Sequence, residues 1–161
     1  MKKITISIFI LLLILSACSG NDSTSDHEED GHHHTPSGDL REKTASSNEL
    51  PSFLNDHAEE MGNIYAAVSQ HQELLEHIPC YCGCGDDAIG HKDNYDCFIH
   101  QNEADGSIVW DDHATRCNAC LTIAVESIVE YQNGKSIKEI REMIEENYQE
   151  GYGEPTPTPE V

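Results

Sequence analysis

Three cysteines alternate with other residues in the sequence PCYCGCG, which spans residues 79–85. In an extended strand, successive thiols on one face would lie roughly 6.6 Å apart, because the chain rises about 3.3 Å per residue. Two sulfur atoms bound to one zinc ion lie at most about 4.6 Å apart, which is twice the Zn–S bond length. Glycine permits a tight turn. The stretch therefore predicts a turn in which the sulfur atoms of Cys80, Cys82 and Cys84 converge.

Three further cysteines follow this turn, and histidines lie between them. Six thiols with nearby imidazoles suit Zn²⁺, Cu(I) or an iron–sulfur cluster. Because six thiolates exceed the four ligands of one tetrahedral ion, they imply a sulfur-bridged polynuclear centre, or one mononuclear site plus a disulfide. The candidate metal ligands are Cys80, Cys82, Cys84, Cys97, Cys117 and Cys120, with His91 and His113 as supplementary ligands.

Two other interpretations of the cysteines remain open. In an exported protein, six cysteines fit three disulfides, and the partners of the turn cysteines would then be the three downstream cysteines. The other interpretation is thiol redox chemistry, because a Cys-x-x-Cys pair near a helix start has a lowered thiol pKa. No βαβ pattern precedes Cys117 and Cys120, which argues against a thioredoxin-like fold.

The N-terminus has the pattern of an export signal. Lys2 and Lys3 precede an almost unbroken apolar run over residues 4–15, which is too short for a comfortable transmembrane helix. The run ends in small residues before Cys18, which resembles the lipobox of bacterial lipoproteins. That resemblance implies removal of residues 1–17 and a diacylglyceryl group on Cys18, and two acyl chains anchor a protein durably. We therefore expect an extracytoplasmic protein held on the cell membrane by lipid.

Residues 18–50 are expected to be the lipidated cysteine and a disordered tether. They are rich in Ser, Asp, Glu, Gly and His, and too poor in apolar residues to offset the entropy lost on ordering. Within them, residues 27–34 read HEEDGHHH. Short histidine-rich tracts often bind metal ions, although a solvated polar spacer explains this tract equally well.

Residues 51–150 are predicted to form a Cys-rich helical domain. Apolar residues at three- and four-residue steps indicate a helix over residues 52–78 that can break near His71. A second helix is predicted at about residues 114–132, with Cys117 and Cys120 on its buried face. A capping box at residues 136–139 opens a third helix. Weaker patterns at residues 97–99 and 107–110 allow one short β-hairpin.

The predicted fold class is therefore mostly α, a small helical domain with a Cys-rich loop and at most one short hairpin. Residues 151–161 are predicted to be a disordered tail, because Pro and Thr alternate over residues 155–159.

The charge of the chain limits its partners. Thirty acidic and nine basic residues give a net charge of −21. Because nucleic acids and anionic membranes are bound by clustered Lys and Arg, we expect no nucleic-acid partner and no polybasic membrane patch. There is no glycine-rich phosphate loop and no serine nucleophile motif. We therefore expect a protein that is not an enzyme; its sequence does not identify a protein partner.

The sequence PCYCGC at residues 79–84 matches the signature of the bacterial PCYCGC-motif proteins, letter for letter. The chain resembles that family over roughly residues 55–150, including Gly90-His91, Asp96-Cys97-Phe98, His113 and the paired cysteines. The resemblance implies an exported, often lipid-anchored protein of uncharacterised function, and it supports the domain limits. It supplies no activity, so the metal hypothesis depends on ligand chemistry.

Together these patterns predict a lipoprotein that binds a thiophilic metal, Cu(I) or Zn²⁺, as a store, scavenger or delivery protein. The alternative is a disulfide-stapled interaction module without metal, and a thiol oxidoreductase is a further alternative.

The lipobox generates a testable prediction. Cys18→Ala removes the thiol that would carry the lipid, so we expect the protein to move from the membrane fraction to the medium, or to accumulate as unprocessed precursor. Ser19→Ala, at the neighbouring position, should fractionate as the wild type does. Unchanged membrane association together with a normal mature mass in the Cys18 variant would contradict the lipoprotein assignment.

Overall fold

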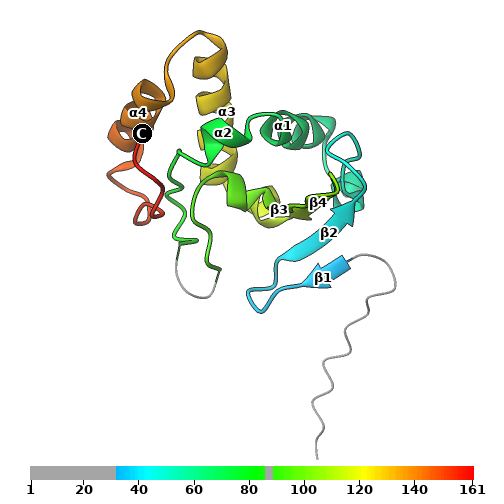
Figure 1. The fold of residues 1–161 in the computed structure, drawn as a ribbon. Coiled ribbons are helices and arrows are strands. Elements are labelled where there is room, and N and C mark those ends of the chain that lie inside the picture. Colours follow the sequence, from blue (N-terminus) through cyan, green and yellow to red (C-terminus); the bar gives the residue numbers. More distant parts are fainter. Residues whose placement is uncertain (1–31, 86–88) are drawn as a thin grey trace, which may run out of the picture.

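The computed structural model describes residues 32–85 and 89–161. In this part of the chain 43% of the residues are helical and 13% lie in strands. Four antiparallel strands form one sheet beside four α-helices (Figure 1). The prediction of a mostly α fold is therefore wrong, because the fold is mixed α and β.

The sheet has the strand order β1-β2-β4-β3. Each strand is antiparallel to its neighbours, and β2 pairs with β4 from Arg41 opposite Asp111 to Thr44 opposite Ile108. Strands β3 and β4 form the short hairpin that the sequence allowed, with an irregularity in β3 between Ile99 and Gln101. The strands are β1 His32–His34, β2 Leu40–Thr44, β3 Ile99–Asn102 and β4 Ile108–Asp111.

Strands β1 and β2 come from the segment predicted to be a disordered tether, so that prediction is wrong for residues 32–50. The inward-facing residues of β2 are polar: Glu42 and Thr44 are both buried. The Glu42 carboxylate accepts hydrogen bonds from the Ser52 backbone N–H and hydroxyl, and the Thr44 hydroxyl accepts one from Trp110 Nε1 at 2.8 Å. Burying a polar group costs little free energy when the group has hydrogen-bond partners of this kind. Hydrophobic alternation, the signal that the sequence analysis sought, is absent from this strand.

The region predicted as one helix over residues 52–78 is divided into three. A 3₁₀ helix, η2, spans Ser52–Asp56, α1 spans Glu59–Ser69 and α2 spans Gln72–Leu75. The predicted break is confirmed at His71, whose φ of −124° and ψ of 35° are not helical. This break lets the chain turn toward the cysteine loop that follows.

The later helices lie close to their predicted positions. The 3₁₀ helix η4 at His113–Arg116 precedes α3 at Asn118–Gln132, so the α-helix begins later than expected. Helix α4 spans Ile137–Tyr148, and its predicted capping box between Ser136 and Glu139 is confirmed. A further 3₁₀ turn, η3, spans Tyr95–Cys97.

The buried core includes residues of the sheet and of all four α-helices of the described chain. The ring of Tyr65, on α1, packs edge-on against Phe98 at a centroid distance of 5.1 Å and lies 6.1 Å from Trp110. Its hydroxyl donates to the backbone carbonyl of Asp111 at 2.9 Å. This contact ties α1 to the end of β4, where the chain turns toward His113.

The C-terminal residues 153–156, here called the C-terminal strap, are hydrogen-bonded to the fold, so the prediction of a disordered tail is wrong for them. The Gly153 N–H donates to Tyr81 O at 2.8 Å, and Thr156 N–H donates to Cys80 O at 3.0 Å. The Cys80 N–H in turn donates to the Thr156 hydroxyl at 2.9 Å. Figure 1 shows the end of the chain returning beside the loop that follows α2. The strap therefore fixes the first half of the PCYCGC loop.

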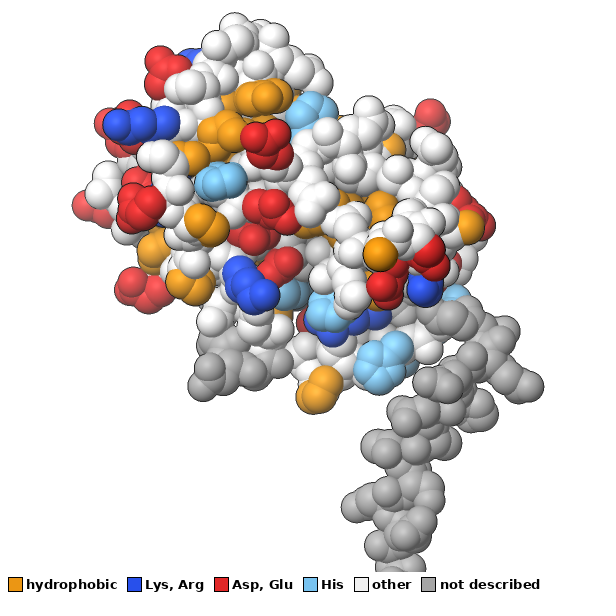
Figure 2. All heavy atoms as spheres, viewed as in Figure 1, with side chains coloured by type: hydrophobic (Ala, Val, Ile, Leu, Met, Phe, Trp, Pro, Cys, Tyr) orange, Lys and Arg blue, Asp and Glu red, His pale blue; other side chains and the backbone are white. Residues whose placement is uncertain are grey.

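Acidic side chains are spread over the molecular face seen in Figure 2, with few Lys or Arg among them, as the net charge of −21 requires. Within residues 32–85 and 89–161, no helix is both long and apolar enough to cross a membrane. The predicted signal peptide and Cys18 lie outside the described residues.

The Trp110–Thr44 hydrogen bond tests whether β2 belongs to the fold. Thr44→Val keeps the shape but leaves the buried Trp110 N–H without its acceptor, so we expect a loss of about 1–3 kcal/mol in the free energy of unfolding, measured by denaturant titration. Thr122→Val is the matched control, because the Thr122 hydroxyl is exposed on α3. Equal stability of the two variants would show that β2 does not pack as described.

Candidate metal centre

The six cysteines of the described chain converge, and none of them is in a disulfide. The Sγ atoms of Cys80, Cys82 and Cys120 form a triangle with sides of 3.4, 3.3 and 3.5 Å. Cys97 Sγ lies 3.3 Å from Cys120 Sγ and 3.7 Å from Cys84 Sγ. A disulfide would bring two sulfur atoms to about 2.05 Å. Two thiolates on one tetrahedral zinc lie about 3.8 Å apart, given a Zn–S bond of about 2.3 Å.

The loop that carries Cys80, Cys82 and Cys84 is held from two sides. The C-terminal strap fixes its first half, and His91 N–H donates to Cys84 O at 3.1 Å at its end. Gly83 has a φ of +81°, a conformation that other residues rarely adopt. These restraints produce the turn that the glycines predicted, with sulfur atoms closer than an extended chain allows.

The remaining three cysteines come from two other elements. Cys97 ends η3, and the buried Asn94 beside it donates from its side-chain amide to Cys120 O at 3.1 Å. Cys120 lies in the first turn of α3, and Cys117 is the N-cap residue, whose sulfur accepts from the Cys120 N–H at 3.5 Å. Loop, 3₁₀ turn and helix thus meet at one point.

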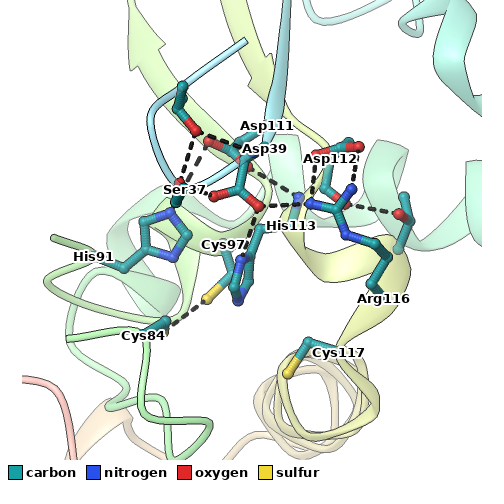
Figure 3. A network of polar contacts seen from close by, with 12 residues as sticks. Ser37, Asp39, Cys84, His91, Cys97, Asp111, Asp112, His113, Arg116 and Cys117 are labelled. Atoms are coloured by element: carbon teal, nitrogen blue, oxygen red, sulfur yellow. Dashed lines mark hydrogen bonds and ion pairs between the residues drawn. The ribbon is translucent and has the colours of Figure 1, made fainter. Parts of the chain in front are cut away.

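His113 is directed toward the sulfur atoms by a carboxylate. Its Nε2 lies 3.8 Å from Cys82 Sγ. Its Nδ1 lies 3.2 Å from Asp39 Oδ1, and Figure 3 shows this contact. Arg116 donates to the same Asp39 oxygen at 2.6 Å and also to the Asp112 carboxylate. When Nδ1 carries the proton that Asp39 accepts, the Nε2 lone pair faces the cysteines, which is how outer-shell carboxylates orient metal-binding histidines.

His91, the other predicted supplementary ligand, lies behind His113. The two imidazole rings pack edge-on with centroids 4.8 Å apart. His91 is only 4% exposed, and neither ring nitrogen has a hydrogen-bond partner, although Nε2 lies 4.0 Å from Asp111 Oδ2. It belongs to none of the compact donor groups among the described residues. The structure therefore brings His113, and not His91, among the sulfur atoms.

Crowding shifts the protonation of these groups. Hydrogen bonds from Cys117 and Cys120 lower the pKa of Cys82. Burial disfavours a charged His113, but hydrogen bonds to Cys117 and Cys82 and the charge of Asp39 raise the pKa of His113 to about 12. The contact between His113 Nε2 and Cys82 Sγ therefore favours a Cys82 thiolate beside a protonated His113. Ionising more of the clustered thiols requires further positive charge nearby, and a bound metal ion supplies it while displacing the protons.

Three groups of four donors are compact enough to hold a metal ion, since all ligand atoms within each group lie within 4.8 Å of one another. Cys82 belongs to all three groups. The first group has four sulfur atoms, and the other two each include His113. The groups are Cys80, Cys82, Cys97 and Cys120; Cys82, His113, Cys117 and Cys120; and Cys82, Cys84, Cys97 and His113.

The sequence analysis missed the residues that hold the ligands in place. Asp39 lies in the segment predicted to be a tether, and Thr156 and Gly153 lie in the predicted disordered tail. An Asp or Thr in a polar segment carries no periodic signal, so no pattern in this sequence could have identified them. The acidic trio of Asp39, Asp111 and Asp112 also forms a compact group, but Arg41 and Arg116 already pair with it.

Comparisons with known proteins agree with the motif. A family model described as a protein of unknown function with PCYCGC motif matches residues 7–161. This match confirms the resemblance that the sequence indicated. Neither the curated proteins nor the solved structures include a significant match to the chain.

The close approach of the C-terminal strap to the loop gives a second test of the site. In Gly153→Ala the new Cβ would lie 2.7 Å from Gly83 N, so the loop backbone has to shift. We expect faster labelling of the reduced thiols and a lower melting temperature. Gly62→Ala is the control, since its Cβ would meet only the Leu50 side chain, at 3.5 Å, and alanine favours a helix interior. Unchanged thiol labelling in the Gly153 variant would show that the strap does not position the cysteines.

Proposed function

We propose that this chain, which belongs to the PCYCGC-motif family of unknown function, binds a thiophilic metal ion, Cu(I) or Zn²⁺, through its converging cysteines and His113. The protein acts outside the cytoplasmic membrane as a metal store, scavenger or delivery protein. The observation that carries the proposal is the triangle of Cys80, Cys82 and Cys120 sulfur atoms, with sides of 3.3–3.5 Å.

The chemistry of the donors supports a soft or borderline metal. Thiolates select Cu(I) and Zn²⁺ over hard cations such as Mg²⁺ and Ca²⁺, which take oxygen ligands. Cys80, Cys84, Cys97 and Cys120 are buried, whereas Cys82 and Cys117 are half-buried. The site is therefore shielded from water on one side and open on the other.

The residues that contact His113 and the cysteine loop are of the kind that orient metal ligands in proteins. Asp39 holds the Nδ1 side of His113 while Nε2 faces Cys82, and the C-terminal strap holds the loop. Removing the hydrogen-bond partner of a metal ligand usually lowers metal affinity by about 10–100-fold.

The location outside the membrane is also a proposal, and it depends on the N-terminal sequence. The basic start, the apolar run and the small residues before Cys18 support export and lipid anchoring. Thiols in an oxidising compartment tend to form disulfides. A bound metal would keep six neighbouring cysteines reduced there.

One observation favours a second candidate function, thiol redox chemistry. Cys117 and Cys120 form a Cys-x-x-Cys pair at the N-terminus of α3, which is the spacing of many dithiol redox sites. A dithiol redox site needs two cysteines, however, and here six converge. The metal proposal accounts for the convergence of cysteines from three separate elements at one point.

The metal proposal predicts a change in stability. Protein purified under reducing conditions without added metal should contain Cu or Zn by elemental analysis. Because the metal links a loop to a helix in the native state alone, its removal should lower the melting temperature by several degrees, and Cu(I) or Zn²⁺ should restore it. Binding should weaken as the pH falls, because protons compete for the thiolates.

Single variants identify the ligands. Cys82→Ser, Cys120→Ser and His113→Ala should each impair the rescue by metal, whereas His57→Ala, at an exposed position outside the cluster, should not. If the protein contains no metal and neither ion shifts the melting of the reduced form, the metal proposal fails. An intact mass that has lost six hydrogens under non-reducing conditions would then support three disulfides.

A further inference from the structure

The three donor groups overlap in a way that limits how many ions the centre holds, if the proposed metal binding is correct. The all-sulfur group shares two members with each of the groups that contain His113. A thiolate sulfur has several lone pairs and bridges two metal ions, whereas a neutral imidazole nitrogen has one lone pair and binds a single ion. The two groups that contain His113 therefore cannot both be filled. The described residues have room for two ions, and one of them is in the all-sulfur group.

The position of the second ion follows from Cys117 and Cys84. Cys117 and His113 belong to one short segment, η4 and its C-cap, and both line the same surface pocket. Cys84, the competing donor, is 1% exposed and lies 3.7 Å from Cys97 Sγ. The half-buried Cys117 shares the pocket with His113, so it is better placed than the buried Cys84 to bind an ion that enters from solvent.

We propose that the centre holds two metal ions bridged by the sulfur atoms of Cys82 and Cys120. The inner ion has Cys80 and Cys97 as its other ligands, and the outer ion has His113 and Cys117. Cys84 is a spare thiol in this arrangement.

The two ions differ in their access to solvent. Cys80 and Cys97 are 0% exposed. The outer ligands His113 and Cys117 line a pocket of about 280 Å³, together with Asp39, Arg116 and other residues. The outer ion is therefore the one that exchanges with the surroundings, and the inner ion is retained behind it.

Native mass spectrometry of the full chain loaded with Zn²⁺ under reducing conditions tests the proposal. The wild type should bind two ions, and Cys117→Ser should bind one. Cys84→Ser, the same change within the loop, should still bind two. Cys82→Ser and Cys120→Ser each remove a bridging sulfur atom, so each should lose at least one ion. Circular dichroism should confirm that each variant is folded.

A chelator that binds Zn²⁺ measures the exchange. The wild type should release its ions in a fast and a slow phase of equal size, and Cys117→Ser should lack the fast phase. A single ion in the wild type, three or more ions, loss of an ion from Cys84→Ser, or release in one phase would each overturn this arrangement while leaving metal binding itself intact. A protein that binds no Zn²⁺ and no Cu(I) would refute the proposed function instead.

Discussion

The Sγ atom of Cys120 is the point at which the separate parts of this protein meet. It lies 3.3 Å from Cys80 Sγ and from Cys97 Sγ, and 3.5 Å from Cys82 Sγ. This contact, the hydrogen bond from the Asn94 amide and the C-terminal strap help to fix the loop of Cys80 and Cys82 relative to α3. A metal ion at this point would replace weak thiol contacts by coordinate bonds, which is why stability and metal binding should be coupled.

A second constraint connects the sheet to the same centre. Asp39, in the turn between β1 and β2, receives hydrogen bonds from His113 and Arg116, and Asp111 at the end of β4 receives one from Arg41. Buried carboxylates are costly unless they are paired, and here each has a cationic partner. The sheet therefore positions the Asp39 carboxylate, which is paired with Arg116, next to His113 Nδ1. This contact fixes the orientation of the imidazole ring.

How much the sequence predicts depends on the kind of signal each part carries. The capping box at Ser136 and the turn at Gly83 depend on local chemistry, and both are present in the structure. Strand β2 was missed because its inward residues, Glu42 and Thr44, are polar and become compatible with burial only through partners distant in sequence. The roles of Asp39 and Thr156 are hidden for the same reason. The candidate ligands could be identified from the cysteine spacing. The residues that hold them in place could be identified only from the structure.

If the centre binds metal as proposed, the distribution of burial across it favours transfer of the metal over a purely structural role. Structural zinc sites are closed, with all ligands supplied by the protein and no access from solvent. Here Cys97 is fully buried while His113 and Cys117 line a pocket, so one side of the centre is closed and the other is open. The net charge of −21 attracts cations to the protein. Arg116 pairs with Asp39 and Asp112, so in the proposed centre the sulfur atoms would be the stronger attraction for a soft cation.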